Sequence, residues 1–585
     1  MRFVFAILLA TFPLWAHDAH GHATAPIEAR HLNSPLADPS AALESGRAVY
    51  EKSCAGCHGA DGKARTPLAA TLAVRPTNLT DYLMDSMTDG EIYWVATHGI
   101  ASSMPAFDKS LDDTQRWATV LWVRELRSRQ RATELSRLGP YEWDLPPGFP
   151  YPNVPHDNSM TQEKVRLGRY LFYDTRLSLN QSQSCATCHQ QSRAFTDGKA
   201  HGFGSTGQHH PRGPMSLVNV AYSPALTWAN PNMRQLETQA LVPMFGDDPV
   251  ELGMSGREEV LLERLMAEPV YQKLFAAAYR NQAFPFSIGN VTKAIASFER
   301  TILSGDSPYD RYRRGDDANA ISESARRGET LFFSEKLECF HCHGGFNFTG
   351  TVDYFDKGFA EVEFHNTGLY NVKGRFSYPE PNLGLYNFTQ LADDVGKFKA
   401  PTLRNIAVTA PYMHDGGIAT LSEALDHYAA GGRRIDSGPL AGDGSRNPNR
   451  SEFIKGFTLT SQDKQDVIAF LESLTDETLL TNPALSNPWT TAPVSGASYR
   501  LHGEVVQVFL QDGTVSLYHD AIPGLMGAMK APNAMEYKVS DRNRLKTLKP
   551  GQSVEATVRK QGGKYVLEDL KPGPPKQKTT TGAVQ

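Results

Sequence analysis

The chain has no cysteine outside three short motifs of the form C-x-x-C-H, and all six of its cysteines are used in them. The sequence therefore leaves no thiol for a disulfide. Long hydrophobic runs are also missing: the apolar stretch Phe3–Leu14 is too short to span a bilayer, and no later stretch is longer. With 59 basic and 64 acidic residues, the net charge is −5. This balance provides no basic surface and argues against nucleic acid as a partner.

C-x-x-C-H is the attachment motif of c-type haem. Its two thiols bond to the vinyl groups of the haem, and the adjacent histidine presents a ring nitrogen to the iron. A lone C-x-x-C is also typical of a redox dithiol or half a zinc site, but three complete copies argue against both. We therefore expect three covalent haems. The residues are Cys54, Cys57, His58, Cys185, Cys188, His189, Cys339, Cys342 and His343.

A glycine followed four residues later by an aromatic residue precedes each motif in a helical pattern. The pairs are Gly46 and Tyr50, Gly168 and Phe172, and Gly328 and Phe332. This weak internal repeat predicts three copies of one cytochrome c unit. The chain is long enough for three or four domains.

The first unit resembles a small monohaem cytochrome c, with His58 as the proximal ligand of the iron. Met104, in Met-Pro-Ala-Phe, matches the loop that supplies the sixth ligand in that family. A thioether ligand favours ferrous iron, whereas a lone methionine elsewhere is usually core packing. An iron with two axial ligands is closed, so we expect this unit to carry electrons.

From Met160 to Trp489 the chain resembles the dihaem cytochrome c peroxidase and MauG superfamily. The matching strings are LGRYLFYDTRLS from Leu167, AFTDG from Ala194, and FKAPTLRNIAVTAPYMHDG from Phe398. Within the superfamily, PMFGDDPVELG from Pro243 is most similar to MbnH-type enzymes, which are associated with copper-binding partners.

This resemblance makes the haem on Cys185 and Cys188 the peroxide site, with Gln239 and Glu251 in its distal pocket. A positioned carboxyl can move a proton between the two peroxide oxygens; a solvated surface carboxylate is the alternative for Glu251. In some relatives a histidine closes this haem. The matching stretch here is Gln208, His209 and His210, and an open haem remains equally compatible with the sequence.

The resemblance also implies ligands and neighbours for the third haem. Tyr428 stands where MauG-type enzymes have a tyrosine ligand; His427 is the second choice, and simple helix packing is the alternative. Trp228 matches the tryptophan between the two haems, or else an ordinary buried aromatic. Asn219, Thr409 and Pro411 match residues around a calcium ion, which prefers oxygen ligands.

The C-terminal segment changes to the alternating pattern of strands, with a hairpin signal at Asp512-Gly513. It resembles the small β-barrel of CusF-like periplasmic copper proteins. One imidazole and several thioethers suit Cu(I), although residues 530–534 are inserted before the last methionine and a Met-rich core loop is the alternative. The expected copper ligands are His519, Met526, Met529 and Met535.

These observations predict a mainly α fold with one single and one tandem pair of cytochrome c-type haem units, followed by a small antiparallel β-barrel. Met1–Ala16 has the form of a secretory signal and predicts export to the periplasm. The expected parts are the signal peptide (1–16), a His-containing tail (17–38), a monohaem cytochrome c (39–130), a linker (131–159), the peroxidatic haem domain (160–315), the electron-transfer haem domain (316–489), a linker (490–498), the barrel (499–572) and a polar tail (573–585).

The function expected from the sequence is a periplasmic trihaem oxidoreductase that uses hydrogen peroxide and oxidises a redox or copper-related protein partner. One alternative is a cytochrome c peroxidase that reduces peroxide to water. Another, of a different class, is a copper-binding or electron-transfer protein without peroxide chemistry.

Overall fold

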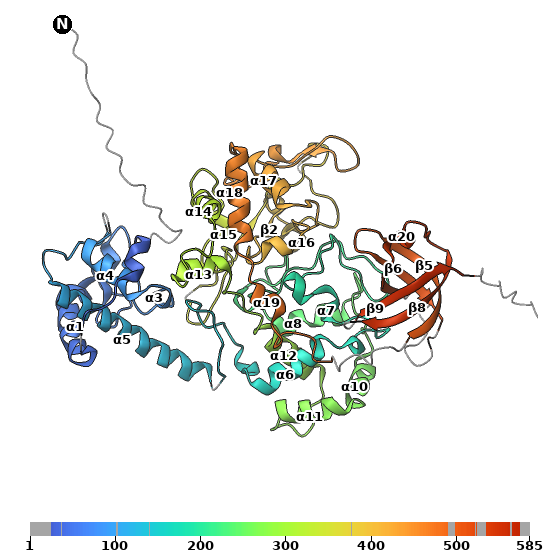
Figure 1. Cartoon of the computed structure of the whole chain (residues 1–585), viewed down its shortest axis with the longest axis horizontal. Coiled ribbons are helices and arrows are strands. Elements are labelled where there is room, and N and C mark those ends of the chain that lie inside the picture. The colour runs from blue at the N-terminus through green and yellow to red at the C-terminus, as the bar shows by residue number, and fades with distance from the viewer. Residues whose placement is uncertain are drawn as a thin grey trace, which may run out of the picture. The chain divides into compact units, whose positions relative to one another are not determined.

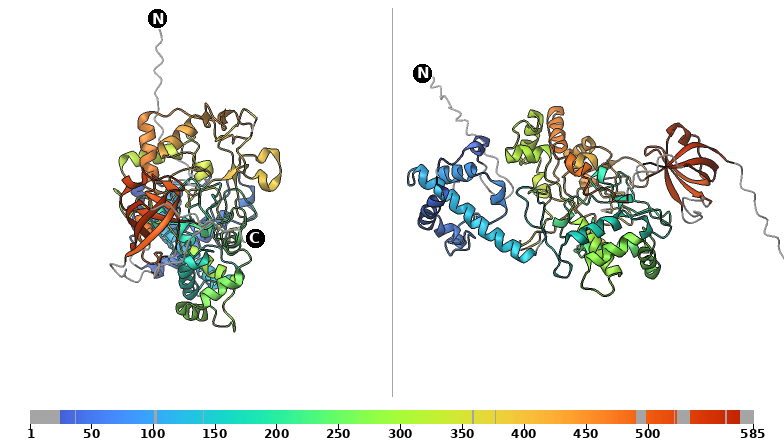
Figure 2. Two further views of the ribbon diagram at one scale, coloured as in Figure 1. Left: turned by 90° about the vertical axis from the view of Figure 1, so that its right-hand side faces the viewer. Right: turned by 60° about the horizontal axis from the view of Figure 1, so that its bottom comes forward.

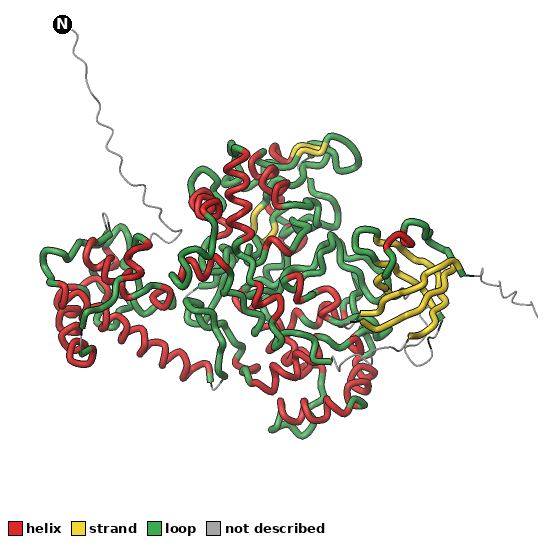
Figure 3. Tube along the Cα trace, viewed as in Figure 1, coloured by secondary structure: helices red, strands yellow, loops and turns green. Residues whose placement is uncertain are grey.

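The computed structural model describes residues 25–573, except 37, 101–102, 140, 358, 376, 490–497, 521, 523–533 and 562–563. It divides into two compact units, which are treated separately below. The first takes the chain up to Pro155 together with Leu303–Ala407 and Leu421–Thr478, and the second takes His156–Ile302, Val408–Thr420 and the chain from Leu479 onward. Helices and loops make up most of both units, and the longer strands gather at the C-terminus (Figures 1 and 3).

The first unit begins with the helices of the N-terminal cytochrome, and its three longest helices each start at a side chain that accepts backbone N–H bonds. Asp38 caps the first helix, and Thr88 and Asp112 form capping boxes with Glu91 and Gln115. The elements are η1 (Ile27–His31), α1 (Pro39–Ser53), α2 (Ala55–His58), η2 (Ala69–Thr71), α3 (Leu83–Ser86), α4 (Asp89–His98) and α5 (Asp113–Leu138).

Helix α5 runs eight residues past the domain end predicted at residue 130. The charged residues that made this stretch look like a solvated linker are paired instead. Arg127 is 4% exposed, and its guanidinium lies 2.7 Å from the Asp85 carboxylate and 3.1 Å from the Glu134 carboxylate. Glu134 lies two helical turns after Arg127. The ion pairs of Arg127 with Asp85 and Glu134 therefore fix the extended part of α5 against the cytochrome domain.

The rest of the first unit surrounds the third C-x-x-C-H motif. Its helices are α13 (Pro308–Arg314), α14 (Glu323–Phe332), α15 (Phe340–His343), α16 (Tyr386–Thr389), α17 (Leu421–Ala429) and α18 (Ser461–Glu472). Two short antiparallel ladders join β1 (Phe364–His365) to β2 (Phe398–Lys399) and β3 (Arg434–Ile435) to β4 (Gly442–Asp443). Helix α19 (Glu477–Thr481) leads out of the unit.

The second unit holds the middle motif. Its helices are α6 (Gln162–Phe172), α7 (Cys185–Cys188), α8 (Leu236–Gln239), α9 (Leu241–Phe245), α10 (Glu258–Met266), α11 (Pro269–Ala278) and α12 (Ile288–Glu299). The short 3₁₀ turns in the two units are η3 (His156–Asn158), η4 (Thr175–Leu177), η5 (Gln191–Arg193), η6 (Val220–Tyr222), η7 (Ala392–Asp394), η8 (Ile406–Val408) and η9 (Gly444–Arg446).

The chain crosses between units more often than the predicted linear boundaries allow. Residues 479–489 were expected to finish the third haem domain, but they pack in the second unit. Leu479 and Leu485 join the core around α6, and the Trp489 indole N–H donates to the Tyr170 carbonyl at 2.8 Å. Segment Val408–Thr420 belongs to the second unit as well. Hydrophobic periodicity gives no sign of such exchanges.

The glycine–aromatic repeat has the same structural cause before each of the three haem motifs. A Cβ at Gly46 would lie 1.9 Å from the Ala118 carbonyl oxygen of α5. The same contact occurs from Gly168 to the Ala294 oxygen of α12 at 1.8 Å, and from Gly328 to the Asp466 oxygen of α18 at 1.9 Å. The helix before each haem motif therefore crosses a later helix at a distance that only glycine permits.

The C-terminal barrel is closed, with strand order β5-β6-β7-β9-β8 (Figures 1 and 2). Its strands are β5 (Ser498–Phe509), β6 (Thr514–His519), β7 (Met535–Val539), β8 (Ser553–Gln561) and β9 (Lys564–Pro572), with helix α20 (Arg542–Leu545) after β7. All neighbours are antiparallel except β7 and β9. Five strands cannot alternate direction around a ring, so one parallel pair must occur. The predicted barrel is confirmed with this addition.

Within the described part of the chain, no helix combines the length and apolar character needed to cross a membrane.

Candidate functional site

The three motif histidines share one geometry. Each Nδ1 lies near a backbone carbonyl oxygen: His58 at 2.9 Å from Thr77, His189 at 2.8 Å from Phe195 and His343 at 3.2 Å from Phe348. A carbonyl only accepts, so each Nδ1 must donate, which leaves Nε2 as the free lone pair. A bond from Nδ1 to a backbone carbonyl orients an imidazole that ligates a metal through Nε2. The donor set of each motif fits a c-type haem.

The loop of Met104 is closed by two backbone bonds with Ile100, both at 2.9 Å. Gly99 begins the turn with φ of +69°, and a Cβ there would lie 2.5 Å from the Met104 carbonyl oxygen. The described backbone on both sides of the expected sixth ligand is therefore fixed by the Ile100–Met104 bonds and by Gly99. Its role as an iron ligand stays a prediction.

Glu251 lies beside the middle motif. Burial raises the pKa of its carboxyl to about 7, and its charge in turn raises the pKa of the Cys185 and Cys188 thiols. His210 Nε2 lies 3.8 Å from the Glu251 carboxylate, and burial lowers the pKa of this imidazole. A carboxyl that is half protonated near neutral pH is suited to moving a proton in both directions.

The stretch where a closing histidine was sought forms a small hairpin against this carboxyl. The Gln208 side-chain oxygen accepts the Val250 backbone N–H at 2.8 Å, and Ser205 N–H donates to the Glu251 carbonyl at 2.6 Å. His209 is exposed and packs edge-on against Phe203. Of the three residues considered, His210 is thus the one that faces Glu251.

The other residues expected at the peroxide site occupy the same unit. Gln239 ends α8 and is half-buried. The Trp228 indole N–H donates to the Gly213 carbonyl at 3.0 Å. Asn219 is buried with a left-handed backbone (φ +56°), while Thr409 and Pro411 lie in the segment that the second unit takes from the later half of the chain. Their roles toward peroxide, electrons and calcium stay predictions.

Glu299 is a residue that the sequence reading missed. It is 5% exposed at the end of α12, and burial raises its pKa to about 8. Its Oε2 has no hydrogen-bond partner among the described residues, and its charge influences the Cys185 thiol. The signal available was a carboxyl that ends the apolar helix Ile288–Glu299.

Tyr428 lies on α17, close to the third motif. Burial raises the pKa of its phenol well above the ordinary value, and the Cys342 and Cys339 thiols add to this shift. It is therefore a neutral phenol unless a metal ion competes for its proton. The neighbouring His427 is buried, and the charge that influences it comes from Arg433. The two side chains thus face different surroundings, with Tyr428 on the side of the cysteines.

The barrel places His519 at the end of β6, where it is 3% exposed. Its Nδ1 donates to the Asp520 carbonyl at 2.7 Å, and its buried Nε2 has no hydrogen-bond partner among the described residues. Burial lowers the pKa of the imidazole, which keeps it neutral. Met535 begins β7 and pairs with Leu517 on β6. This free buried nitrogen fits a metal ligand; Met526 and Met529 lie outside the described residues.

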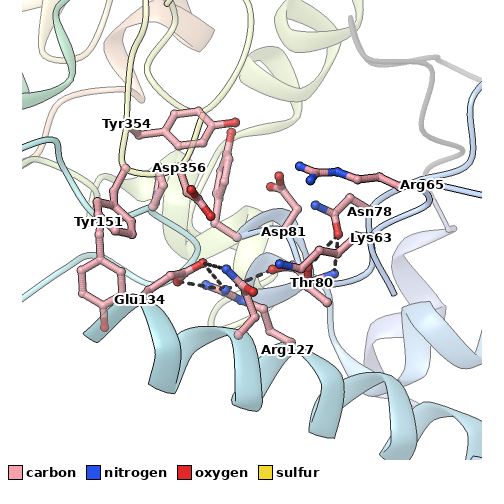
Figure 4. A pocket seen from close by; sticks show the side chains of 14 residues that line it. Lys63, Arg65, Asn78, Thr80, Asp81, Arg127, Glu134, Tyr151, Tyr354 and Asp356 are labelled. Carbon is pink, nitrogen blue, oxygen red and sulfur yellow. Dashed lines mark hydrogen bonds and ion pairs between the residues drawn. The ribbon is translucent and has the colours of Figure 1, made fainter. Parts of the chain in front are cut away.

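A pocket in the first unit lies where the N-terminal cytochrome meets the linker and the loop around Tyr354. Figure 4 shows Arg127 and Glu134 turned toward each other at its edge, with Thr80 beside them. Its lining is mostly polar and charged and comes from two parts of the first unit, the N-terminal cytochrome and the segment around Tyr354. The remaining residues drawn there include Lys63, Arg65, Asn78, Asp81, Tyr151 and Asp356.

Comparison with known proteins identifies three families along the chain. Residues 162–318 match the family described as di-haem cytochrome c peroxidase. Residues 41–123 match cytochrome c oxidase, cbb3-type, subunit III, and residues 498–572 match copper binding periplasmic protein CusF.

Individual relatives agree with this division. The methylamine utilization protein MauG of Methylorubrum extorquens is 35% identical over 331 residues, which cover 56% of this chain and 82% of the relative. The cytochrome-c peroxidase IdrP1 of Pseudomonas sp. (strain SCT) is 35% identical over 60% of this chain and 91% of its own length. The crystal structure of a MauG-like protein associated with microbial copper homeostasis is 47% identical, with 60% of this chain and all of that one covered and a TM-score of 0.59.

Three observations support one assignment: the haem motifs, the buried carboxyl beside one of them, and these similarities. The chain belongs to the di-haem cytochrome c peroxidase and MauG family of haem oxidoreductases, and it carries a cbb3-type cytochrome c domain before the family domain and a CusF-type copper-binding domain after it.

Proposed function

We propose that this protein is an exported trihaem oxidoreductase that uses hydrogen peroxide at the haem on Cys185 and Cys188 and oxidises a protein partner. The observation that carries the proposal is Glu251, a carboxyl with a pKa near 7 that influences both thiols of that motif. Family membership supplies the reaction class.

The haem, when bound through Cys185, Cys188 and His189, would supply an iron centre that exchanges electrons with hydrogen peroxide. Glu251 then removes a proton from the near peroxide oxygen and returns it to the leaving oxygen, which departs as water. Gln239 orients the peroxide by hydrogen bonding. His189, oriented by its bond to the Phe195 carbonyl, would hold the iron through its Nε2.

The expected ligand set of the third haem favours protein oxidation. Tyr428 is our choice of sixth ligand because its phenol responds to Cys339 and Cys342, whereas His427 responds to Arg433. A phenolate is a hard anionic ligand that favours oxidised iron. A partner haem held in the ferric state would lack the readily donated electron of ferrous iron, so the oxidising equivalents from peroxide would remain available to another protein.

Two links to copper suggest the class of partner. The relative of known structure is associated with copper homeostasis, and this chain adds a CusF-type domain. We therefore propose a copper-related periplasmic protein as the partner. The signal-like start supports export, and Asn219, Thr409 and Pro411 are proposed to lie around a calcium ion.

A second function, reduction of peroxide to water, is favoured by a contact inside the first unit. The Tyr82 ring of the fused cytochrome meets the Phe346 ring edge-on at 5.6 Å. Phe346 follows His343 by three residues, and its carbonyl accepts a bond from Arg404 at 2.8 Å. This contact is a short route for electrons from the cytochrome to the third haem.

Measurements on the full-length protein test the proposal. Its mass should equal the polypeptide without the signal peptide plus three haems, with no free thiol. Peroxide should be consumed in the presence of a protein substrate that gains oxidised side chains. Rapid peroxide consumption that requires only reduced cytochrome, with no modified partner, would favour the second function. No consumption with either donor would remove the peroxide chemistry altogether.

A further inference from the structure

The barrel meets the peroxide-site domain through one charged and one aromatic contact. Lys199 Nζ lies 2.9 Å from the Glu536 carboxylate of β7. The same ammonium group lies 5.5 Å from the centre of the Phe509 ring, and this ring meets Phe203 edge-on at 6.3 Å. We refer to Lys199, Phe203, Phe509 and Glu536 as the barrel contact. All four residues belong to the second unit.

On the haem side, the barrel contact begins next to the middle motif. The Phe203 backbone N–H hydrogen-bonds to the Cys188 sulfur, so the residue whose ring meets Phe509 also touches the middle motif. The Lys199 backbone is held by its N–H bond to the Asp197 carboxylate at 2.9 Å. Gly213 packs against it, since a Cβ there would lie 3.1 Å from the Lys199 carbonyl oxygen.

On the barrel side, the contact adjoins the expected copper ligands. Glu536 directly follows Met535, which points into the barrel and is 6% exposed. Met535 pairs with Leu517, two residues before His519 and its free Nε2. The barrel contact therefore joins Phe203, whose backbone touches the Cys188 sulfur, to Glu536, the residue next to a soft metal ligand.

We propose that Cu(I) held by His519 and Met535 is an electron donor to the peroxide site on Cys185 and Cys188. The balanced reaction is H₂O₂ + 2 H⁺ + 2 Cu(I) → 2 H₂O + 2 Cu(II), with the two copper ions delivered in turn to the barrel and Glu251 moving the proton. Cu(II) prefers nitrogen and oxygen ligands over thioethers, so the product leaves this site. The inference rests on the proposed peroxide chemistry and adds copper as a second reductant.

The contact itself can be tested without haem or copper chemistry. A zero-length carbodiimide cross-link on the full-length protein should join Lys199 to Glu536, read by mass spectrometry of the linked peptides. The variant Lys538→Glu, two residues along the same outer face of β7, should leave the cross-link intact. Absence of the Lys199–Glu536 product under conditions that link other pairs would overturn the proposed route.

The reaction is tested anaerobically with the full ferric protein carrying Cu(I), mixed with half an equivalent of peroxide. Cu(II) should appear in the electron paramagnetic resonance spectrum. Two copper ions should be oxidised for each molecule of peroxide consumed. Lys199→Glu should slow its appearance at least 10-fold, and Lys199→Glu combined with Glu536→Lys should restore it. Lys538→Glu is the matched control. Competition with a Cu(I) chelator should give equal copper affinity for all four proteins.

The outcomes separate the two proposals. If the haem spectra respond to peroxide without copper but Cu(I) persists, the inference is overturned and the proposed function stands. Equal Cu(II) rates in the wild type and Lys199→Glu would show direct reaction of copper with peroxide and would also overturn the inference. If peroxide produces no haem change with or without copper, both proposals fail.

Discussion

Replacing Glu251 by glutamine keeps the size of the side chain and removes only its ability to carry a proton. We expect Glu251→Gln to lower the rate constant for peroxide by about 10²–10⁴-fold, the usual contribution of a positioned acid–base group. All three haems should remain attached. Stopped-flow mixing with peroxide gives the rate, and Glu258→Gln, at an exposed position on α10, is the control that should behave as the wild type.

The pH dependence of the same reaction has a definite sign. The base form of Glu251 is the deprotonated carboxylate, and its pKa is about 7. The second-order rate constant should therefore rise as pH increases and level off above neutrality. In Glu251→Gln this rise should disappear. A wild-type profile that is flat between pH 5 and 9 would assign the proton transfer to another group, with His210 as the nearest alternative.

Glu299 should make the protein less stable at higher pH. Its folded-state pKa of about 8 exceeds the ordinary value of 4.5, so the native state binds the proton more tightly than the unfolded state. The free energy of unfolding then falls between pH 4.5 and 8, by at most about 1.4 kcal/mol per pH unit. Glu299→Gln should remove this slope. Denaturant titrations at pH 5 and pH 8 measure it, and an unchanged slope contradicts the assignment.

At the scale of helices, the crossing glycines set the packing of each haem unit. An alanine at Gly168 would place its Cβ 1.8 Å from the Ala294 carbonyl oxygen, so α6 and α12 must separate. We expect Gly168→Ala to cost about 1–3 kcal/mol, as overpacking usually does. Gly289→Ala, in α12 with no atom within 4 Å of the added Cβ, should be neutral or stabilising. Thermal unfolding followed by the haem absorbance distinguishes them, and equal midpoints would contradict the role of the crossing.

The helices that precede the haem motifs could be predicted because the glycine–aromatic pattern that marks them is local in the sequence. Gly168, where α6 crosses α12, and Phe172, the buried aromatic, lie one turn apart before Cys185. The extension of α5 could not be predicted, since Arg127 looks solvated until Asp85 is known to face it. Residues 479–489 joined the other unit for a similar reason. Such contacts depend on residues far apart in the chain, and a single sequence does not reveal them.

The site follows the same rule. The proximal histidines and Glu251 stand in strings that resemble those of known enzymes, and the structure places Glu251 beside Cys185 and Cys188. Glu299 was missed because its carboxyl reads as the ordinary end of a helix. The barrel contact was missed because Lys199 and Glu536 are ordinary surface charges in the sequence and become partners only in the folded chain.

At the scale of the whole molecule, the remaining choice is between protein oxidation and plain peroxide reduction. A peroxidase of the second kind needs a partner haem that is reduced before peroxide reacts, which a methionine ligand favours. As the proposed ligand, Tyr428 would favour the ferric state instead. The fully ferric protein, mixed with one equivalent of peroxide and no donor, should therefore react at once, and the change in haem absorbance should persist until a protein substrate is added.

Tyr428→Met is the variant that should reverse this behaviour, because its thioether favours ferrous iron at the third haem. It should react with peroxide only after one electron has been added. Tyr428→Phe removes the ligand without supplying a new one and separates loss of the phenolate from gain of the thioether. If the ferric wild type stays inert until one haem is reduced, the protein reduces peroxide to water, and the Tyr82–Phe346 contact becomes the main route of its electrons.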